Sequence, residues 1–150
     1  MRSDRDRRSV TAIERAVVAC FLRHGGKICL LKRSLAVGSS PGQWHCVTGF
    51  LEPGVLPLEQ AITEIMEETG LTAEAVRLAG APDPLRMERP SQGWVWVVYP
   101  FLFDAATPSL RLDWEHDEYR WIDPSELASS DCVPWIRDVW SALRQEQQAD

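Results

Sequence analysis

The sequence predicts an α/β fold, a sandwich of helices around a mixed β-sheet. Continuous apolar runs of strand length recur along the chain, whereas only a few segments show helical periodicity. The chain has 150 residues, of which 45% are hydrophobic and 25% charged, ordinary values for a globular protein. That length favours one compact domain with a single core. We therefore expect a flexible, polar N-terminal arm over residues 1–11 and one domain over residues 12–150.

Apolar runs of strand length predict six strands. The run Ala16–Leu22 is typical of a strand that is buried on both faces. The pair Gly25–Gly26 then suits a tight turn into the next strand. Polar segments rich in Ser, Gly or Pro separate other runs, so residues 34–43 and 82–93 are predicted to be loops. The expected strands cover residues 15–23, 27–32, 44–47, 74–78, 94–103 and 118–122.

Two amphipathic helices are also expected. The first begins at Pro57, which suits a first helical turn, and ends before Gly70, which suits a C-terminal cap. Residues 123–126 indicate a further helix start, and residues 131–144 are predicted to form a C-terminal helix. The buried face of that last helix should be formed by Trp135, Ile136, Val139, Trp140 and Leu143.

Charge and apolar patterning argue against two classes of partner. The formal net charge of -6 argues against binding to long nucleic acids, which requires a basic face. The longest apolar run, residues 94–103, is too short to span a bilayer as a helix, and the N-terminus lacks the apolar segment of a signal peptide. None of the four cysteines forms a Cys-x-x-Cys pair, so we expect buried, reduced thiols in a cytoplasmic protein. The oligomeric state stays open between monomer and homodimer.

The first helix carries three carboxylates on one face. Glu64, Glu67 and Glu68 stand at positions i, i+3 and i+4. Like charges at this spacing destabilise an isolated helix, and a divalent cation would remove that penalty. Mg²⁺ prefers oxygen ligands and often binds through a few carboxylates together with substrate phosphates. On spacing alone, a solvated glutamate-rich face explains the same pattern.

The sequence around this face resembles the Nudix box, G-x5-E-x7-R-E-U-x-E-E-x-G-U, where U is a bulky aliphatic residue. The resemblance continues into residues 29–33, 42–49 and 114–122, and roughly residues 16–128 can be placed on the family. It implies the α/β/α sandwich of the Nudix hydrolases. Within residues 49–71, the positions that match in register are Gly49, Glu64, Ile65, Glu67, Glu68, Gly70 and Leu71.

The resemblance implies hydrolysis of a phosphoanhydride bond in a nucleoside diphosphate linked to a group X, or in a nucleoside triphosphate-like substrate. In the family, water attacks one phosphorus, and box carboxylates hold Mg²⁺, for which Mn²⁺ can substitute. By position, Glu64, Glu67 and Glu68 are the implied metal ligands, and Glu67 is also a candidate catalytic residue. Glu115 is expected to complete the site as a further ligand or as the general base, with Glu118 as the alternative.

Four further residues are candidates for contacting a small phosphorylated substrate. Arg33 ends the second predicted strand, where it could meet a phosphate, although an exposed cation at a strand end is as common. Arg86 and Arg89 lie in a polar segment where the family often places substrate specificity. Trp44 could stack on a base, although a tryptophan buried in the core is at least as common.

Two positions depart from the box. Val55 stands where the box has Glu, and Thr63 stands where it has Arg. In the family that Glu and Arg commonly pair and brace the loop against the helix. Replacing both partners of an ion pair by uncharged residues can be nearly neutral for stability. The departures favour a second hypothesis, a catalytically weak or inactive nucleotide-binding module. A purely structural domain is a third reading, which the box match disfavours.

Overall fold

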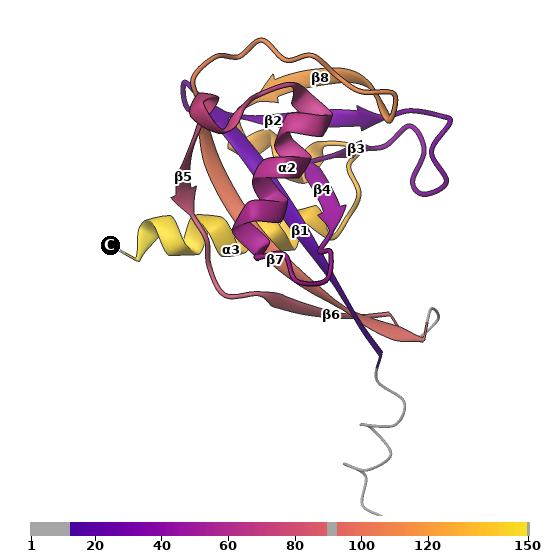
Figure 1. Cartoon of the computed structure of the whole chain (residues 1–150). Helices are drawn as coiled ribbons and strands as arrows, with labels where there is room; N and C mark the ends of the chain where they lie inside the picture. The colour runs from indigo at the N-terminus through magenta and orange to yellow at the C-terminus, as the bar shows by residue number, and fades with distance from the viewer. Residues whose placement is uncertain (1–12, 90–92, 150) are drawn as a thin grey trace, which may run out of the picture.

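The computed structural model describes residues 13–89 and 93–149 and shows one mixed sheet with a long helix on each face (Figure 1). This architecture confirms the predicted α/β fold. The arm expected over residues 1–11 lies outside the described residues. The strands are β1 (Ile13–His24), β2 (Lys27–Arg33), β3 (Trp44–His45), β4 (Val47–Phe50), β5 (Val76–Gly80), β6 (Leu85–Arg89), β7 (Trp94–Ala105) and β8 (His116–Ile122). The helices are α2 (Pro57–Thr69) and α3 (Ile136–Gln148), with 3-10 turns η1 (Ala73–Ala75) and η3 (Pro124–Ser129).

β1 is the centre of the sheet. It pairs in parallel with β7 and antiparallel with β2 and β4. The turn between β1 and β2 places Gly25 at φ 56° and Gly26 at φ 79°, a left-handed conformation that favours glycine. The predicted hairpin is therefore confirmed. β8 pairs antiparallel with β2, which brings the late acidic segment beside the end of β2 at Arg33.

The core lies on both faces of β1, as its continuous apolar run predicts. Alternate residues Val17, Ala19 and Phe21 face the layer that contains α3. The intervening residues Val18, Cys20 and Leu22 face the layer that contains α2. All four cysteines are buried, and none forms a disulfide bond. Among the described residues, no helix is long and apolar enough to cross a membrane.

The helix boundaries follow the expected terminal residues. α2 has Pro57 in its first turn and ends at Gly70, whose φ of 76° is the left-handed cap conformation. Asp123 caps η3, because its side chain accepts a hydrogen bond from the Ser125 amide while Glu126 accepts one from the Asp123 amide.

Several predicted boundaries differ from the structure: the expected strand 44–47 is split into β3 and β4, the other strands shift by a few residues, and two segments differ more. Residues 82–93 were expected to form a loop, but β6 occupies residues 85–89 and pairs antiparallel with β7. Alternating apolar and charged residues give β6 a strand pattern, which the flanking prolines obscure in the sequence. α3 begins at Ile136 instead of residue 131, because residues 131–133 run beside β3 and precede Pro134.

Candidate active site

A cleft of about 980 Å³ opens where α2, the β2–β3 loop and the turn before β8 meet. Its charged wall carries Glu64 and Glu68 from α2, Glu115 from the turn before β8 and Arg33 from the end of β2. Another part of the lining is aromatic. The aromatic side chains that line it are Phe50, Trp96, Trp114 and Trp135. The cleft therefore joins an acidic end to a surface suited to a planar, apolar group.

Helix α2 delivers the acidic end of the cleft. Ala61 and Ile65 are fully buried against the sheet, which fixes the rotation of the helix. Glu64 and Glu68 stand one turn apart, so both side chains project from the face beside the β4 backbone. A Cβ built on Gly49 would overlap the Glu64 carboxyl group, so a larger residue at position 49 would displace that side chain.

The two carboxyl groups share an electrostatically unfavourable environment. Glu68 is 3% exposed, and burial first, then the negative charge of Glu64, raise its pKa well above the usual range. Asp113 and Glu115 raise the pKa of Glu68 further. Burial also raises the pKa of Glu64, against the opposing effect of a hydrogen bond from Gln60. The site therefore favours a cation or a shared proton between the carboxylates.

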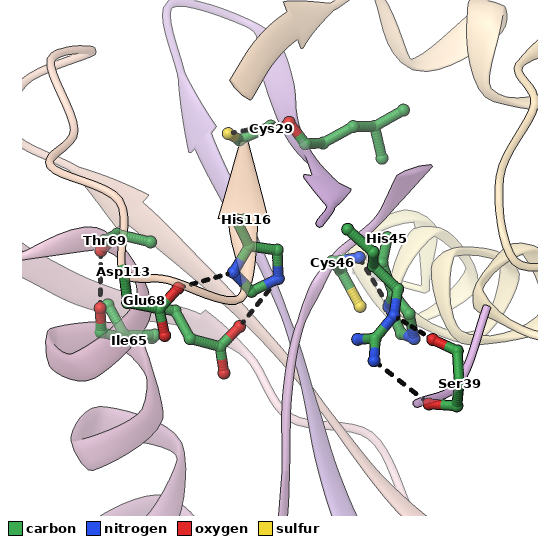
Figure 2. Close-up of polar contacts among 11 residues, drawn as sticks. Cys29, Ser39, His45, Cys46, Ile65, Glu68, Thr69, Asp113 and His116 are labelled. Atoms are coloured by element: carbon green, nitrogen blue, oxygen red, sulfur yellow. Dashed lines mark hydrogen bonds and ion pairs between the residues drawn. The ribbon is translucent and has the colours of Figure 1, made fainter. Parts of the chain in front are cut away.

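A histidine joins Glu68 to the turn before β8. The Nδ1 atom of His116 lies 2.9 Å from Asp113 Oδ1, and its Nε2 atom lies 3.6 Å from Glu68 Oε1. Figure 2 shows the imidazole ring between the two carboxyl groups. The side chains of His116 and Glu68 are only 3% and 4% exposed. This contact holds the late acidic segment against α2 and closes one side of the cleft.

The donor set of the cleft fits a hard divalent cation. Glu64 and Glu68 offer carboxylate oxygens, which Mg²⁺ and similar ions prefer, and burial first, then neighbouring carboxylates, raise the pKa values of both groups. Within residues 13–89 and 93–149, no group of three or more His, Cys, Asp or Glu side chains converges enough to hold a metal. Mg²⁺ commonly takes one or two carboxylates and completes its shell with water and phosphate oxygens. Two adjacent carboxylates are therefore sufficient.

The other acidic candidates differ in whether they line the cleft. Glu115 lines the cleft and lies close enough to raise the pKa values of both Glu64 and Glu68. Glu118 is exposed, and its carboxylate lies 3.8 Å from the Lys32 ammonium group, outside the cleft lining. Glu67 is exposed on the solvent side of α2 and is likewise absent from the lining.

Of the three candidate substrate residues whose side chains the structure describes, one lies at the cleft. The guanidinium group of Arg33 lines the cleft and donates to the backbone oxygen of Ser39 at 2.8 Å and to its hydroxyl at 3.1 Å. Trp44 is 9% exposed and packs in the core on the α3 side. Arg86 forms an exposed ion pair with a β1 glutamate, away from the cleft. Arg89 is the last residue of β6.

Sequence reasoning assigned no role to two polar residues of the cleft. His45 is 5% exposed, and its Nδ1 accepts the Cys46 amide hydrogen at 2.8 Å, so the neutral ring presents an N–H from Nε2. Burial lowers the pKa of His45 to about 3, with the charge of Arg33 as the next cause. Gln60 is 4% exposed and contacts Glu64. Gln60 and Glu64 are four residues apart on one helix, and this spacing could have indicated their contact.

Comparison with known proteins decides the family. The profile of the NUDIX domain matches residues 13–143, nearly the whole described chain. The chain belongs to the Nudix family. The resemblance drawn from residues 49–71 is thus confirmed, and this Nudix protein is a pyrophosphohydrolase, an enzyme that acts on acid anhydrides.

Two named relatives illustrate the range of the family near this sequence. RNA pyrophosphohydrolase from Dinoroseobacter shibae is 30% identical over 115 residues, which cover 67% of this chain and 71% of the relative. Nucleoside triphosphatase NudI from Escherichia fergusonii is 27% identical over 125 residues, which cover 79% of this chain and 88% of the relative.

Solved structures support the same fold. The crystal structure of a MutT protein from Methanosarcina mazei aligns with a TM-score of 0.73 and 22% identity, covering 91% of this chain and 96% of that chain. An Ap4A hydrolase from C. elegans, solved as a binary complex, aligns with a TM-score of 0.69 and 18% identity, covering 93% and 100% of the two chains. At these identities the likeness establishes the shared fold alone.

Proposed function

We propose that this Nudix pyrophosphohydrolase splits a phosphoanhydride bond in a nucleoside diphosphate linked to a group X, or in a nucleoside triphosphate-like substrate, with Mg²⁺ held by Glu64 and Glu68. The observation that carries the proposal is the pair of adjacent carboxylates, Glu68 buried and Glu64 half-buried, in a cleft that aromatic side chains also line. Phosphates would lie at the acidic end, and a base would stack on the aromatic wall.

The residues of the cleft would have different roles in the reaction. A bound divalent cation supplies charge neutralisation at the phosphates and a lower pKa for coordinated water. Glu64 and Glu68 would hold that cation, and Glu67, whose charge raises the pKa of Glu64, would supply a further carboxylate. Glu115, which lines the same cleft and raises the pKa values of both carboxyl groups, accepts the proton of the attacking water. Arg33 binds a phosphate by exchanging its contacts with Ser39 for phosphate oxygens.

The substrate is proposed to be a small nucleotide. Glutamates outnumber the single arginine in the charged lining of the cleft, so the site depends on a metal to accept polyphosphate. The net charge of -6 opposes contact with a long nucleic acid. Four buried thiols, none in a disulfide bond, support a cytoplasmic location.

A catalytically weak nucleotide-binding module is the second candidate function. It is favoured by the uncharged residues Val55 and Thr63, which replace the charged residues of the family box. The two functions differ in turnover, because both include metal-dependent binding of a nucleotide.

A substrate panel distinguishes them. The purified full chain is incubated with nucleoside triphosphates, dinucleoside polyphosphates and nucleoside diphosphate sugars, with Mg²⁺, with Mn²⁺ or with excess chelator. We expect metal-dependent release of a nucleoside phosphate from at least one class, and none in chelator. Full activity in chelator would contradict the metal proposal. Tight nucleotide binding with Mg²⁺ but no turnover of any class would favour the binding module.

A further inference from the structure

Gln60 lies under the acidic end of the cleft, and both polar ends of its side chain are bound. Its Oε1 accepts the backbone N–H of Glu52 at 3.1 Å, and its Nε2 donates to Glu64 Oε2 at 3.0 Å. The residue is only 4% exposed, on the turn of α2 that precedes Glu64. A single side chain therefore joins the loop before α2 to a carboxylate of the cleft.

The chemistry of the two partners fixes which way the Gln60 amide points. A backbone N–H can only donate, so it must face the amide oxygen. That leaves the amide NH₂ group to face Glu64, whose ionised carboxylate can only accept. The arrangement favours the ionised form of Glu64 and adds no charge to a cleft that is already acidic.

Glu64 is restrained from a second side by strand β4. The backbone at Gly49 lies so close that an added Cβ would overlap the Glu64 carboxyl group. The Gln60 amide thus holds one carboxylate oxygen while β4 blocks movement toward the sheet. The loop itself is tied to β1 through the Leu51 amide, which donates to Ala16 O at 2.9 Å, and to α2 through Gln60.

We propose that Gln60 is a positioning residue, which orients the Glu64 carboxylate toward the cleft and couples that orientation to the loop before α2. The inference rests on the proposed function, in which Glu64 holds the divalent cation. Groups that orient a metal ligand through a hydrogen bond typically contribute 10- to 100-fold in metal affinity or activity. We therefore expect Gln60 to act on metal affinity and turnover more than on substrate affinity.

The test compares Gln60→Met with Ile62→Met, a matched control on the same helix. Methionine has nearly the length of glutamine and makes neither hydrogen bond, whereas Ile62 is partly buried in the apolar cluster under α2. The first measurement is the Kd of the metal-free protein for Mn²⁺ alone. The others are the kcat and KM for the substrate that the panel identifies for wild type, and the Tm. Gln60→Met should bind Mn²⁺ about tenfold more weakly and lose about tenfold in kcat, with KM changed less than threefold.

The control should keep wild-type Kd and kcat whatever its Tm. A Gln60→Met protein with a lowered Tm but with Kd and kcat within twofold of wild type would overturn the inference and leave Gln60 a structural residue. Gln60→Ala removes the same hydrogen bonds without added bulk, and carries the same expectation if the methionine variant fails to fold. A wild-type protein that binds no Mn²⁺ would overturn both the inference and the proposed metal site. Wild-type binding without turnover would overturn only the proposed hydrolysis.

Discussion

The two long helices cover opposite faces of one sheet and bury different kinds of side chain. α3 buries Ile136, Val139 and Leu143, all fully aliphatic. α2 has the same length, yet its buried residues include Gln60 and Glu68. Figure 1 shows the two helices in front of and behind the strands of the sheet. The face covered by α3 therefore contributes stability. The face covered by α2 buries a carboxyl group, which is unfavourable for folding, and forms the site.

The physical cost of the α2 face follows from desolvation. An ionised carboxylate that loses water without a partner is strongly disfavoured, and the nearby Glu64 charge adds repulsion. In α3 the buried surface is apolar and contributes roughly 25 cal/mol per Å² to folding. Substitutions in α3 should therefore change stability alone, whereas removal of the buried Glu68 charge from α2 should change function and stability in opposite directions.

Truncating one buried side chain of α3 should have the largest effect, on the free energy of unfolding. Leu143 is 0% exposed, so Leu143→Ala should lower the free energy of unfolding by about 2–5 kcal/mol. Leu58 on α2 is 39% exposed, and Leu58→Ala should cost less than about 1 kcal/mol. Urea denaturation measures both values. The kcat of folded Leu143→Ala protein should equal that of wild type, and a large fall in its kcat would break the division between the two faces.

Removing the carboxylate of Glu115, the proposed proton acceptor, should have an effect nearly as large, on turnover instead of stability. Glu115→Gln is expected to lower kcat on the order of a hundredfold, with KM and Tm nearly unchanged, because Glu115 faces the acidic pair in the cleft. Glu118→Gln is the control, since that carboxylate lies beside Lys32 outside the cleft lining. Steady-state kinetics of the two variants measures this difference. If only Glu118→Gln were inactive, Glu118 and not Glu115 would be the proton acceptor.

A smaller effect is expected from His45 in acid. Its folded pKa of about 3 lies below the ordinary value of 6.5, so between these values the unfolded chain binds more protons. Stability should therefore fall as the pH falls from 6.5 toward 3. In His45→Gln this contribution is absent, and the loss of unfolding free energy between pH 7 and pH 4.5 should shrink by about 2 kcal/mol. Equal pH dependence in both proteins would show that His45 takes up a proton in the folded state.

The sequence predicted the parts of the site that follow from local spacing. Glu64 and Glu68 are four residues apart on a helix with clear terminal residues, so their shared face needed no tertiary information. The role of Gln60 depends on a loop amide that folds back over α2, and the choice of Glu115 over Glu118 depends on where β8 begins. Both depend on contacts between segments distant in the chain. The strand β6 was missed because the prolines that flank it indicate a loop when read locally.

The central claim is that α2 loses stability at Glu68 in order to hold a cation. Because the folded pKa of Glu68 is raised, its contribution to stability is present below the ordinary carboxyl pKa and is lost as the pH rises through the folded pKa. The decisive measurement is the free energy of unfolding of wild type and Glu68→Gln at pH 8, in chelator and in saturating Mg²⁺. Without metal, Glu68→Gln should be the more stable protein by about 1 kcal/mol or more. Mg²⁺ at a hundred times its Kd should add about 2.7 kcal/mol to wild type and much less to the variant. A Glu68→Gln protein that is less stable in chelator and gains as much from Mg²⁺ as wild type would contradict the account.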